Sequence, residues 1–205
     1  MTEIANNFPD LSQNQLIQFQ KLDGIYQDWN SKINVISRKD IDQLYIKHVL
    51  HSLAIAKIIK FRAGSNILDV GTGGGFPGIP LAILFPEVNF LLIDVILKKI
   101  NVVNDVAEQL GLKNVRAEQI NAEKVTEKFD FVVSRAVTNM TDFVSWTKNK
   151  IKKNDNHDLK NGILYLKGGD LTDELLDFPK AKQYNISEFF DNEFFETKKV
   201  VYLAL

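Results

Sequence analysis

The 205-residue sequence contains no cysteine. A chain without thiols forms no disulfide, binds no metal through thiolates and carries no cysteine nucleophile. The sequence also lacks an apolar run long enough to cross a bilayer. Residues 1–10 have neither the basic start nor the apolar core of a signal peptide. These absences predict a cytoplasmic protein with no membrane partner.

An excess of positive charge is missing as well. The formal net charge is −1, whereas a protein that grips naked nucleic acid usually carries a clear basic excess. Any nucleic-acid surface is therefore expected to be a local patch, and the overall charge argues against RNA or DNA as a substrate. A length of 205 residues, with 45% hydrophobic and 25% charged side chains, is typical of one globular domain with room for an appendage.

The most informative stretch is a glycine-rich loop between an apolar run and a helical pattern. Residues 66–70 form the apolar run, which predicts a buried strand, and five glycines fall between Gly71 and Gly78. Residues 79–85 then continue as a helix with Pro80 in its first turn. Glycines let a ligand approach bare backbone, and the following helix start offers unpaired N–H groups. The stretch therefore predicts a ligand-binding loop.

Two ligand classes fit this loop. The dinucleotide fingerprint G-x-G-x-x-G is matched by Gly73, Gly75 and Gly78, although that match begins beyond the strand end. The other pattern is an acid followed by alternating glycines, which is typical of methyltransferases that use S-adenosylmethionine (SAM). It is formed here by Asp69, Gly71, Gly73 and Gly75. Since SAM carries an ammonium and a sulfonium instead of phosphates, we expect Asp69 to serve its cationic part.

A second acid supports an adenosine ligand. Residues 88–94 form another apolar run that ends in Asp94, 23 residues after Gly71. A carboxylate about 20 residues beyond the glycines is where a pair of ribose hydroxyls is held. This position fits both a dinucleotide and SAM, so it leaves the choice between them open.

The order of the patterned segments predicts the fold. Two amphipathic helices, at residues 11–30 and about 40–60, precede the first strand. Beyond them strands and helices alternate, which indicates a parallel sheet with right-handed crossovers. Two final apolar runs, residues 184–190 and 200–205, are interpreted as an antiparallel pair at the sheet edge. The remaining segments are expected strands at 66–70, 88–94, 114–117, 129–134 and 162–166, and expected helices at 79–85, 97–110, 138–151 and 171–176.

We therefore predict an α/β protein with the Rossmann-like fold of SAM-dependent methyltransferases. Its sheet is expected to have seven strands, mostly parallel, with an antiparallel C-terminal hairpin. Residues 1–62 are interpreted as an N-terminal helical appendage and residues 63–205 as the SAM-binding core, within one compact unit.

Two further strand ends are expected at the ligand site, because an open parallel sheet binds ligands at the carboxyl ends of its strands. The backbone around Ala122 and Glu123, after the third strand, is expected to meet an adenine ring. Arg135, at the end of the fourth strand, can hold an anion bidentately. Either the carboxylate of SAM or a phosphate of the substrate fits that arginine.

A motif that is absent after the fourth strand bears on the methyl acceptor. Many enzymes that methylate exocyclic amines of bases carry Asn/Asp-Pro-Pro-aromatic there, whereas this chain has Ser134-Arg135-Ala136-Val137. An amine must lose a proton during methylation, but a ring nitrogen with a free lone pair attacks directly. Catalysis would then rest on alignment and electrostatics, and no general base is predicted.

His48 and His51 lie three residues apart on the second predicted helix. Two histidines at this spacing could ligate a metal ion, but the sequence offers no evident third ligand nearby. We therefore predict no metal site and expect the histidines to form hydrogen bonds at the edge of the ligand site.

Residues 69–80, Asp-Val-Gly-Thr-Gly-Gly-Gly-Phe-Pro-Gly-Ile-Pro, resemble the signature of the bacterial GidB (RsmG) family of ribosomal RNA methyltransferases. The Phe-Pro-Gly-Ile-Pro extension makes this likeness far more specific than a bare glycine motif. Further segments agree with the family in order and spacing, namely 34–37, 47–53, 134–136 and 167–168. The resemblance covers roughly residues 30–205.

This resemblance implies methylation at N7 of one guanine in 16S ribosomal RNA (rRNA), with SAM as the donor. It also implies a set of SAM contacts, which Asp94 joins from its place at a strand end. Two residues depart from the family pattern, since His51 stands where Asp is common and Val95 where Ser is common. The contacts implied by the resemblance are Gly71, Phe76, Ala122, Glu123 and Arg135.

The expected partner is 16S rRNA within a small-subunit ribonucleoprotein, bound by a monomer. Basic side chains are expected to gather on the face of the pocket, namely Arg38, Lys39, Lys47, Lys98, Lys99, Lys167, Lys198 and Lys199. Two alternatives remain. One is a methyltransferase that acts on a small molecule or a protein, which the net charge favours. The other is a non-catalytic nucleotide-binding module that binds NAD through Gly73, Gly75 and Gly78.

Overall fold

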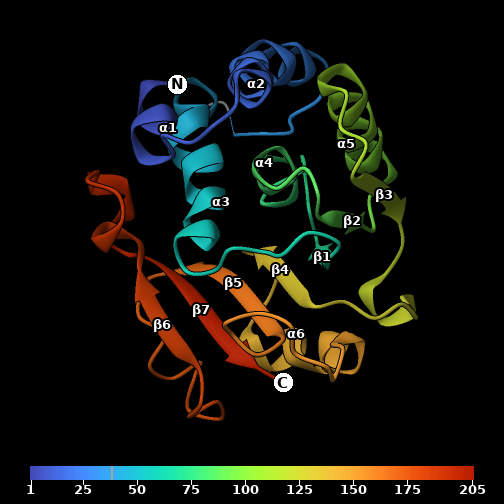
Figure 1. Ribbon diagram of the computed structural model, residues 1–205, viewed down its shortest axis with the longest axis vertical. Coiled ribbons are helices and arrows are strands. Elements are labelled where there is room, and N and C mark those ends of the chain that lie inside the picture. The colour runs from blue at the N-terminus through green and yellow to red at the C-terminus, as the bar shows by residue number, and fades with distance from the viewer. Residues whose placement is uncertain (38) are drawn as a thin grey trace.

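Seven strands form one sheet with helices on both of its faces (Figure 1). The computed structural model of the protein describes residues 1–37 and 39–205. The strands are β1 (Asn66–Val70), β2 (Asn89–Asp94), β3 (Val115–Gln119), β4 (Phe131–Arg135), β5 (Gly162–Gly168), β6 (Lys182–Asn185) and β7 (Lys198–Ala204). Their order in the sheet is β3-β2-β1-β4-β5-β7-β6. Neighbouring strands are parallel except that β7 runs antiparallel to β5 and β6, so the predicted sheet is confirmed.

The helices divide unequally between the two faces. The α-helices of the described residues are α1 (Thr2–Asn7), α2 (Gln13–Lys32), α3 (His51–Leu53), α4 (Gly78–Leu84), α5 (Leu97–Leu110) and α6 (Met140–Thr147). Shorter helical turns occur at Ile41–Gln43, Tyr45–Leu50, Ala54–Lys57, Ala122–Lys124, Lys148–Lys150, Ile186–Glu188 and Glu193–Phe195. Helices α1 to α5 pack on one face, whereas α6 packs on the other. None of the helices in residues 1–37 and 39–205 is both long and apolar enough to span a membrane.

Each face of the sheet has its own apolar core, because successive side chains along a strand point to opposite faces. In β1, Ile67 packs in the core under α1 to α5, whereas Leu68 and Val70 pack in the core under α6. Asp69 follows the same alternation and lies fully buried on the side of Ile67. The acid of the glycine motif therefore points toward α4, whose first residue is Gly78.

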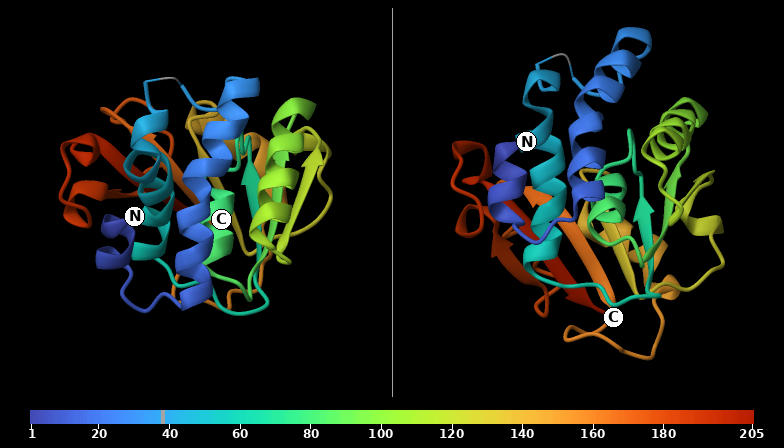
Figure 2. Two further views of the ribbon diagram at one scale, coloured as in Figure 1. Left: turned by 90° about the horizontal axis from the view of Figure 1, so that it is seen from above. Right: turned by 45° about the horizontal axis from the view of Figure 1, so that its top comes forward.

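Helix α2 lies between α3 and α5 and packs on α4, as Figure 2 shows. Its start is fixed by a capping box in which Ser12 Oγ accepts from the Gln15 backbone N–H and Gln15 Oε1 accepts from that of Ser12. Gln15 Nε2 also donates to the carbonyl of Ile83 at the end of α4, at 2.9 Å. The cap thus ties α2 to the helix that follows the glycine loop.

The N-terminal segment shares its core with the sheet. Phe19 and Leu22 of α2 belong to the same apolar cluster as Phe90 of β2 and Phe131 of β4. The division of the chain into residues 1–62 and a core of residues 63–205 stays a prediction about how the unit is organised.

Several predicted segments differ from the structure. The helix predicted at 171–176 is wrong, because the chain there forms turns with one helical hydrogen bond, from Leu175 N–H to the Leu171 carbonyl. So short a segment gains too few hydrogen bonds to offset the cost of starting a helix. The helix predicted at 138–151 is shortened to Met140–Thr147, followed by a single tighter turn.

The N-terminal and C-terminal segments differ as well. Helix α1 had no counterpart among the expected elements. The helix expected at 40–60 is a chain of tighter and wider turns between Ile41 and Lys57. The strand expected at 184–190 begins and ends earlier, at Lys182–Asn185, because Ile186 turns into the core and is fully buried.

Candidate active site

A cavity of about 520 Å³ opens at the carboxyl ends of β1, β2 and β4. This volume is typical of small-molecule and cofactor sites. The strand order reverses between β1 and β4, which is where open α/β sheets bind their ligands. Among the residues predicted for the site, those that line this main cavity are Gly71, Gly73, Phe76, Asp94, Ala122 and Arg135.

The glycine loop turns sharply at the end of β1. Gly71 and Gly73 both adopt positive φ, +67° and +59°, a conformation that favours glycine. A Cβ on Gly71 would collide with Cγ2 of Val137, which lines the same cavity. Position 71 therefore needs glycine both for its backbone and for the space beside it.

Asp69 holds this loop from inside. Its Oδ2 accepts from Thr72 Oγ1 at 2.7 Å and from the Gly78 backbone N–H at 2.8 Å, so one carboxylate oxygen joins the two ends of the loop. Burial raises the pKa of Asp69 to about 7, against the opposing effects of Thr72, Gly78 and Arg135. In this structure the carboxylate of Asp69 is fully buried and does not line the main cavity, so a contact between Asp69 and the cationic part of SAM stays a prediction.

The hydrogen bond from the Gly78 N–H to Asp69 argues against the interpretation of the glycines as a dinucleotide-binding motif. A pyrophosphate needs free N–H groups at the start of the helix after the loop. Here the Gly78 N–H already donates to Asp69, and neither Gly75 nor Gly78 lines the main cavity. A Cβ on Gly75 would meet Ile79 Cγ1 at 2.6 Å, so this glycine serves packing.

Helix α2 supports the loop from the other side. Tyr26 is fully buried, and its hydroxyl donates to the Gly74 carbonyl at 2.6 Å. Asn30 Oδ1 accepts from the backbone N–H groups of Val35 and Ile36, both of which line the main cavity. The N-terminal segment thus supplies part of the cavity wall.

Asp94 lies at the rim of the loop. Its Oδ2 accepts from the Gly73 N–H and its Oδ1 from the Ile96 N–H, both at 3.0 Å. Lys99 Nζ lies 3.7 Å from Oδ2. Each carboxylate oxygen can accept a second hydrogen bond, so the fixed side chain still offers acceptors to a pair of hydroxyls.

The segment after β3 forms one end of the main cavity. Ala122 lines it, whereas Glu123 is exposed and does not line it. Asn121 also lines the cavity, and its Oδ1 fixes the turn by accepting from the Glu123 N–H at 2.9 Å. The sequence-based prediction missed several apolar lining residues because apolar walls carry no motif, namely Val35, Ile93, Ile96, Ile120 and Trp146.

Arg135 forms the opposite end of the main cavity. Its guanidinium donates to His48 Nδ1 at 2.9 Å and to the Lys47 carbonyl at 3.2 Å, and lies 5.2 Å from the centre of the Phe76 ring. Burial lowers the pKa of Arg135 to about 10, so it remains a cation at neutral pH. Burial and the charge of Arg135 lower the pKa of His48 to about 3, so that His48 is a neutral acceptor that orients the arginine.

Only some of the predicted RNA-contacting cations gather together. Lys99 lines the main cavity, and Lys47 and Lys198 line a second cavity next to it. Lys167 lines that second cavity too, but its side chain is only 9% exposed and is paired with Glu174, with Nζ to Oε1 at 2.6 Å. It is therefore not a free RNA contact. Lys39, Lys98 and Lys199 line neither cavity: Lys39 and Lys98 are exposed, and Lys199 is half-buried. Arg38 lies outside the described residues.

Of the two histidines expected to form hydrogen bonds at the edge of the ligand site, His48 does so. His48 forms a hydrogen bond with Arg135 at the edge of the main cavity. His51 is buried beside the rings of Phe194 and Phe195. Among residues 1–37 and 39–205, no three histidines or carboxylates stand close enough to hold a metal ion.

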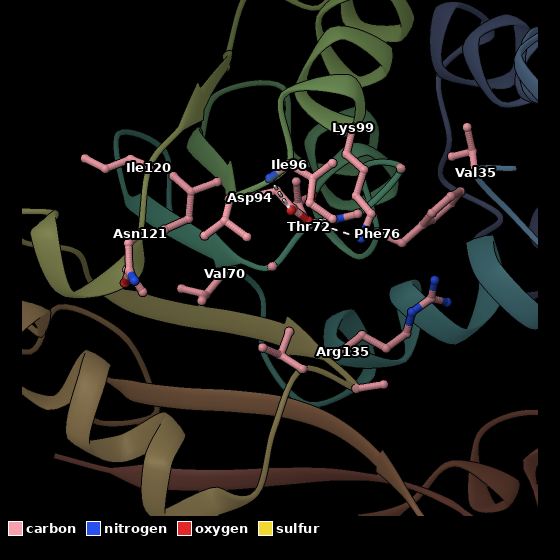
Figure 3. A pocket seen from close by; sticks show the side chains of 18 of the residues that line it. Val35, Val70, Thr72, Phe76, Asp94, Ile96, Lys99, Ile120, Asn121 and Arg135 are labelled. Carbon is pink, nitrogen blue, oxygen red and sulfur yellow. Dashed lines mark hydrogen bonds and ion pairs between the residues drawn. The ribbon is translucent and has the colours of Figure 1, made fainter. Parts of the chain in front are cut away.

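The main cavity fits SAM in the order of its parts. Figure 3 shows Asn121 and Arg135 on opposite sides of the cavity, with Asp94 and Thr72 between them. Backbone groups at Ala122 suit an adenine edge, the carboxylate of Asp94 suits ribose hydroxyls, and Arg135 suits a carboxylate. The parts of SAM are linked in the same order, from adenine through ribose to the methionyl carboxylate. Fold and site together define a SAM-dependent methyltransferase with a Rossmann-like sheet.

Comparisons with known proteins identify the family within this class. The family model described as "rRNA small subunit methyltransferase G" (GidB) matches residues 13–200. Ribosomal RNA small subunit methyltransferase G of Flavobacterium psychrophilum is 74% identical over all of this chain and 98% of its own length. That of Flavobacterium johnsoniae is 68% identical over the same shares. The chain belongs to the GidB family.

A solved structure supports the fold separately. A SAM-dependent methyltransferase from Aquifex aeolicus superposes with a TM-score of 0.57 at 17% identity. The superposition covers 83% of this chain and 100% of that one. At this identity the likeness concerns the fold alone.

Changing Gly71 to alanine tests the space around the loop. Gly71→Ala and Gly111→Ala place alanine at nearly the same positive φ, +67° and +66°, and each should lower the free energy of unfolding by about 1–2 kcal/mol. At Gly71 the new methyl also displaces Val137 in the main cavity, whereas nothing lies within 4 Å of a Cβ at Gly111. We expect calorimetric SAM affinity to fall about tenfold or more in Gly71→Ala alone. Equal losses of affinity in both variants would contradict this.

The buried Asp69 predicts a pH dependence of stability. Its folded-state pKa of about 7 lies above the value of about 3.9 for an unfolded chain, so between these values the folded protein binds more protons. Stability should therefore fall as pH rises from about 4 to about 7. Asp69→Asn removes this contribution, and urea unfolding of the variant should show a flatter decline. Asp10→Asn, which changes an exposed carboxylate, is the control. If Asp69→Asn and wild type decline in parallel, the raised pKa is wrong.

Proposed function

We propose that this protein transfers a methyl group from SAM to N7 of a guanine in the 16S rRNA of the small ribosomal subunit. The observation that carries the proposal is the family match over residues 13–200, which coincides with a main cavity of the right size at the switch point of the sheet. The relatives named above are described as small-subunit rRNA methyltransferases, and that description supports the same substrate here.

Each part of the donor has a matching group in the main cavity. Bound SAM supplies a methyl group carried on a sulfonium. The turn at Ala122 meets the adenine, and Asp94 accepts from the ribose hydroxyls while its own position is fixed by Gly73. Arg135 holds the methionyl carboxylate, and Phe76 beneath the guanidinium keeps water from that contact.

The chemistry at the end of β4 favours a ring nitrogen as acceptor. Methylation of an exocyclic amine releases a proton, which needs a nearby base. The groups at this end of the main cavity are Arg135, a cation, and His48, whose lowered pKa and bond to Arg135 make it a poor base. At guanine N7 a lone pair would form the new N–C bond while the bond between the methyl carbon and the sulfonium sulfur breaks and its electron pair stays on sulfur, so no proton has to be removed. Alignment of N7 with the methyl group is then the main task of the protein.

The near-neutral net charge supports a folded particle as the substrate. A chain of net charge −1 gains little from the phosphate field of naked RNA. We propose that it acts as a cytoplasmic monomer on a small-subunit ribonucleoprotein, where shape and neighbouring proteins contribute to binding. Size-exclusion chromatography with light scattering checks the monomer.

Methyl transfer from labelled SAM tests the function directly. We expect label at a single guanine N7 when small subunits from cells lacking this gene are incubated with the protein, and less label on free 16S rRNA. Borohydride reduction and aniline cleavage, which cut RNA at 7-methylguanosine, locate the site. Arg135→Ala should lower SAM affinity by about 10- to 100-fold, the loss expected when a hydrogen-bonded ion pair is removed. Arg62→Ala, which removes an exposed arginine that lines neither cavity, should match wild type.

The possible outcomes separate the alternatives. No label on particle or RNA, with SAM still bound, would reject the rRNA substrate and favour a small-molecule or protein acceptor. Binding of NAD instead of SAM would favour the non-catalytic module. Label at an exocyclic amine would leave the enzyme class intact and reject N7.

A further inference from the structure

A second cavity of about 250 Å³ adjoins the main cavity. The two cavities share His48, Arg135 and Ala136 as a common wall. We call the second cavity the cationic annex, after the positively charged side chains that line it together with His51 and Phe194, namely Lys47, Arg135, Lys167 and Lys198.

Two of these cations have no carboxylate partner among the described residues. Lys47 Nζ pairs with Asp40 Oδ1 at 2.6 Å, and Lys167 pairs with Glu174. Arg135 binds only neutral acceptors, and Lys198 Nζ lies 5.1 Å from the centre of the Phe194 ring. Within residues 1–37 and 39–205, neither has a carboxylate oxygen within 4 Å. The annex therefore carries uncompensated positive charge, and Asp40 is the one carboxylate among its lining residues.

A buried polar atom in the annex also lacks a partner. His51 is 6% exposed, and its Nε2 forms no hydrogen bond within the described part of the chain. Burial, followed by the charges of Arg135 and Lys198, holds the pKa of His51 well below its usual range. An anion in the annex would offset those charges, favour protonation of His51 and then accept a hydrogen bond from Nε2. This is an observation independent of the lysines, and it points to the same kind of ligand.

The wall between the cavities is held rigidly. Ala136 adopts a φ of +52°, uncommon for a residue with a side chain. The chain beyond it is fixed by the buried Tyr165, whose hydroxyl accepts from the N–H groups of Val137 and Thr138 and donates to the Thr138 carbonyl. A ligand part in the annex is thus kept at a set distance from one in the main cavity.

We propose that the cationic annex binds the backbone phosphate on the 5′ side of the target guanine. This inference rests on the proposed function, since it assumes a guanosine acceptor in RNA. In an anti guanosine the N7 edge of the base faces its own 5′ phosphate. A phosphate held by Lys198 in the annex therefore brings N7 to the wall shared with the main cavity, where the methyl group is offered.

The base itself suits the annex less well. A guanine methylated at N7 becomes a cation, so positive charge develops on the ring in the transition state. Placing that ring inside the annex, beside Lys47 and Lys198, would raise the barrier, whereas a phosphate there is stabilised without opposing the reaction. The charge of the annex thus assigns it to the backbone and leaves the base at the common wall.

Substituting Lys198 tests this assignment. Lys198→Ala should raise the KM for small subunits about tenfold with SAM affinity unchanged, because a charge-assisted phosphate contact is lost. The slope of log affinity for RNA against log salt concentration should fall by about 0.7, the value for one phosphate contact. Lys198→Arg should restore both quantities. Lys182→Ala, which removes an exposed lysine on the neighbouring strand β6, is the matched control and should behave as wild type.

Small competitors provide a second measurement. Guanosine 5′-monophosphate should inhibit the wild-type enzyme more strongly than guanosine, and this preference should vanish in Lys198→Ala. If inorganic phosphate also inhibits the wild-type enzyme, and Lys198→Ala abolishes this inhibition as well, the annex binds both free phosphate and the phosphate of a nucleotide. If wild type methylates RNA but Lys198→Ala keeps its KM, salt slope and competitor preference, the annex proposal is wrong while the proposed function stands. If wild type labels no RNA, the proposed function fails first.

Discussion

The contact of one buried carboxylate with both ends of a loop determines the shape of the main cavity. Asp69 Oδ2 accepts from Thr72 near the start of the glycine loop and from Gly78 at the start of α4. Without this bridge the loop has no internal partner for those donors in an apolar core. The cost is a carboxyl group kept away from water, which appears as its raised pKa of about 7. In this structure Asp69 therefore stabilises the shape of the glycine loop.

Helix α2 stabilises the same loop from its outer side. Tyr26 bonds to Gly74, and Gln15 bonds to the end of α4, so α2 contacts both the loop and the helix that follows it. His48, from the segment that leads into α3, orients Arg135 across the cavity. The groups from β1 to β4 that line the main cavity therefore depend on a segment far earlier in the chain. Their positions cannot be adjusted independently of that segment.

Elements with strong local patterns were predictable from the sequence. The helix at 97–110 ends at Gly111 as expected, and the sheet has the expected antiparallel end. Gly71, Asp94 and Arg135 were placed correctly at strand ends, because parallel strands bring their carboxyl ends together. The role of Asp69 was not predictable, since its neighbours do not reveal which way its side chain points. Partners such as Glu174 for Lys167 depend on contacts between distant segments, which periodicity does not encode.

Strand β7 inserts between β5 and β6, although it follows both in the chain. During synthesis the sheet cannot close until residues 198–204 have left the ribosome exit tunnel, whereas β1 to β5 can pair in sequence order beforehand. Lys198, at the start of β7, reaches the annex only at that moment. A nascent chain could therefore shape its donor cavity early and acquire its full set of acceptor contacts last. The protein would then leave the ribosome on which it is made before Lys198 has taken its place in the annex.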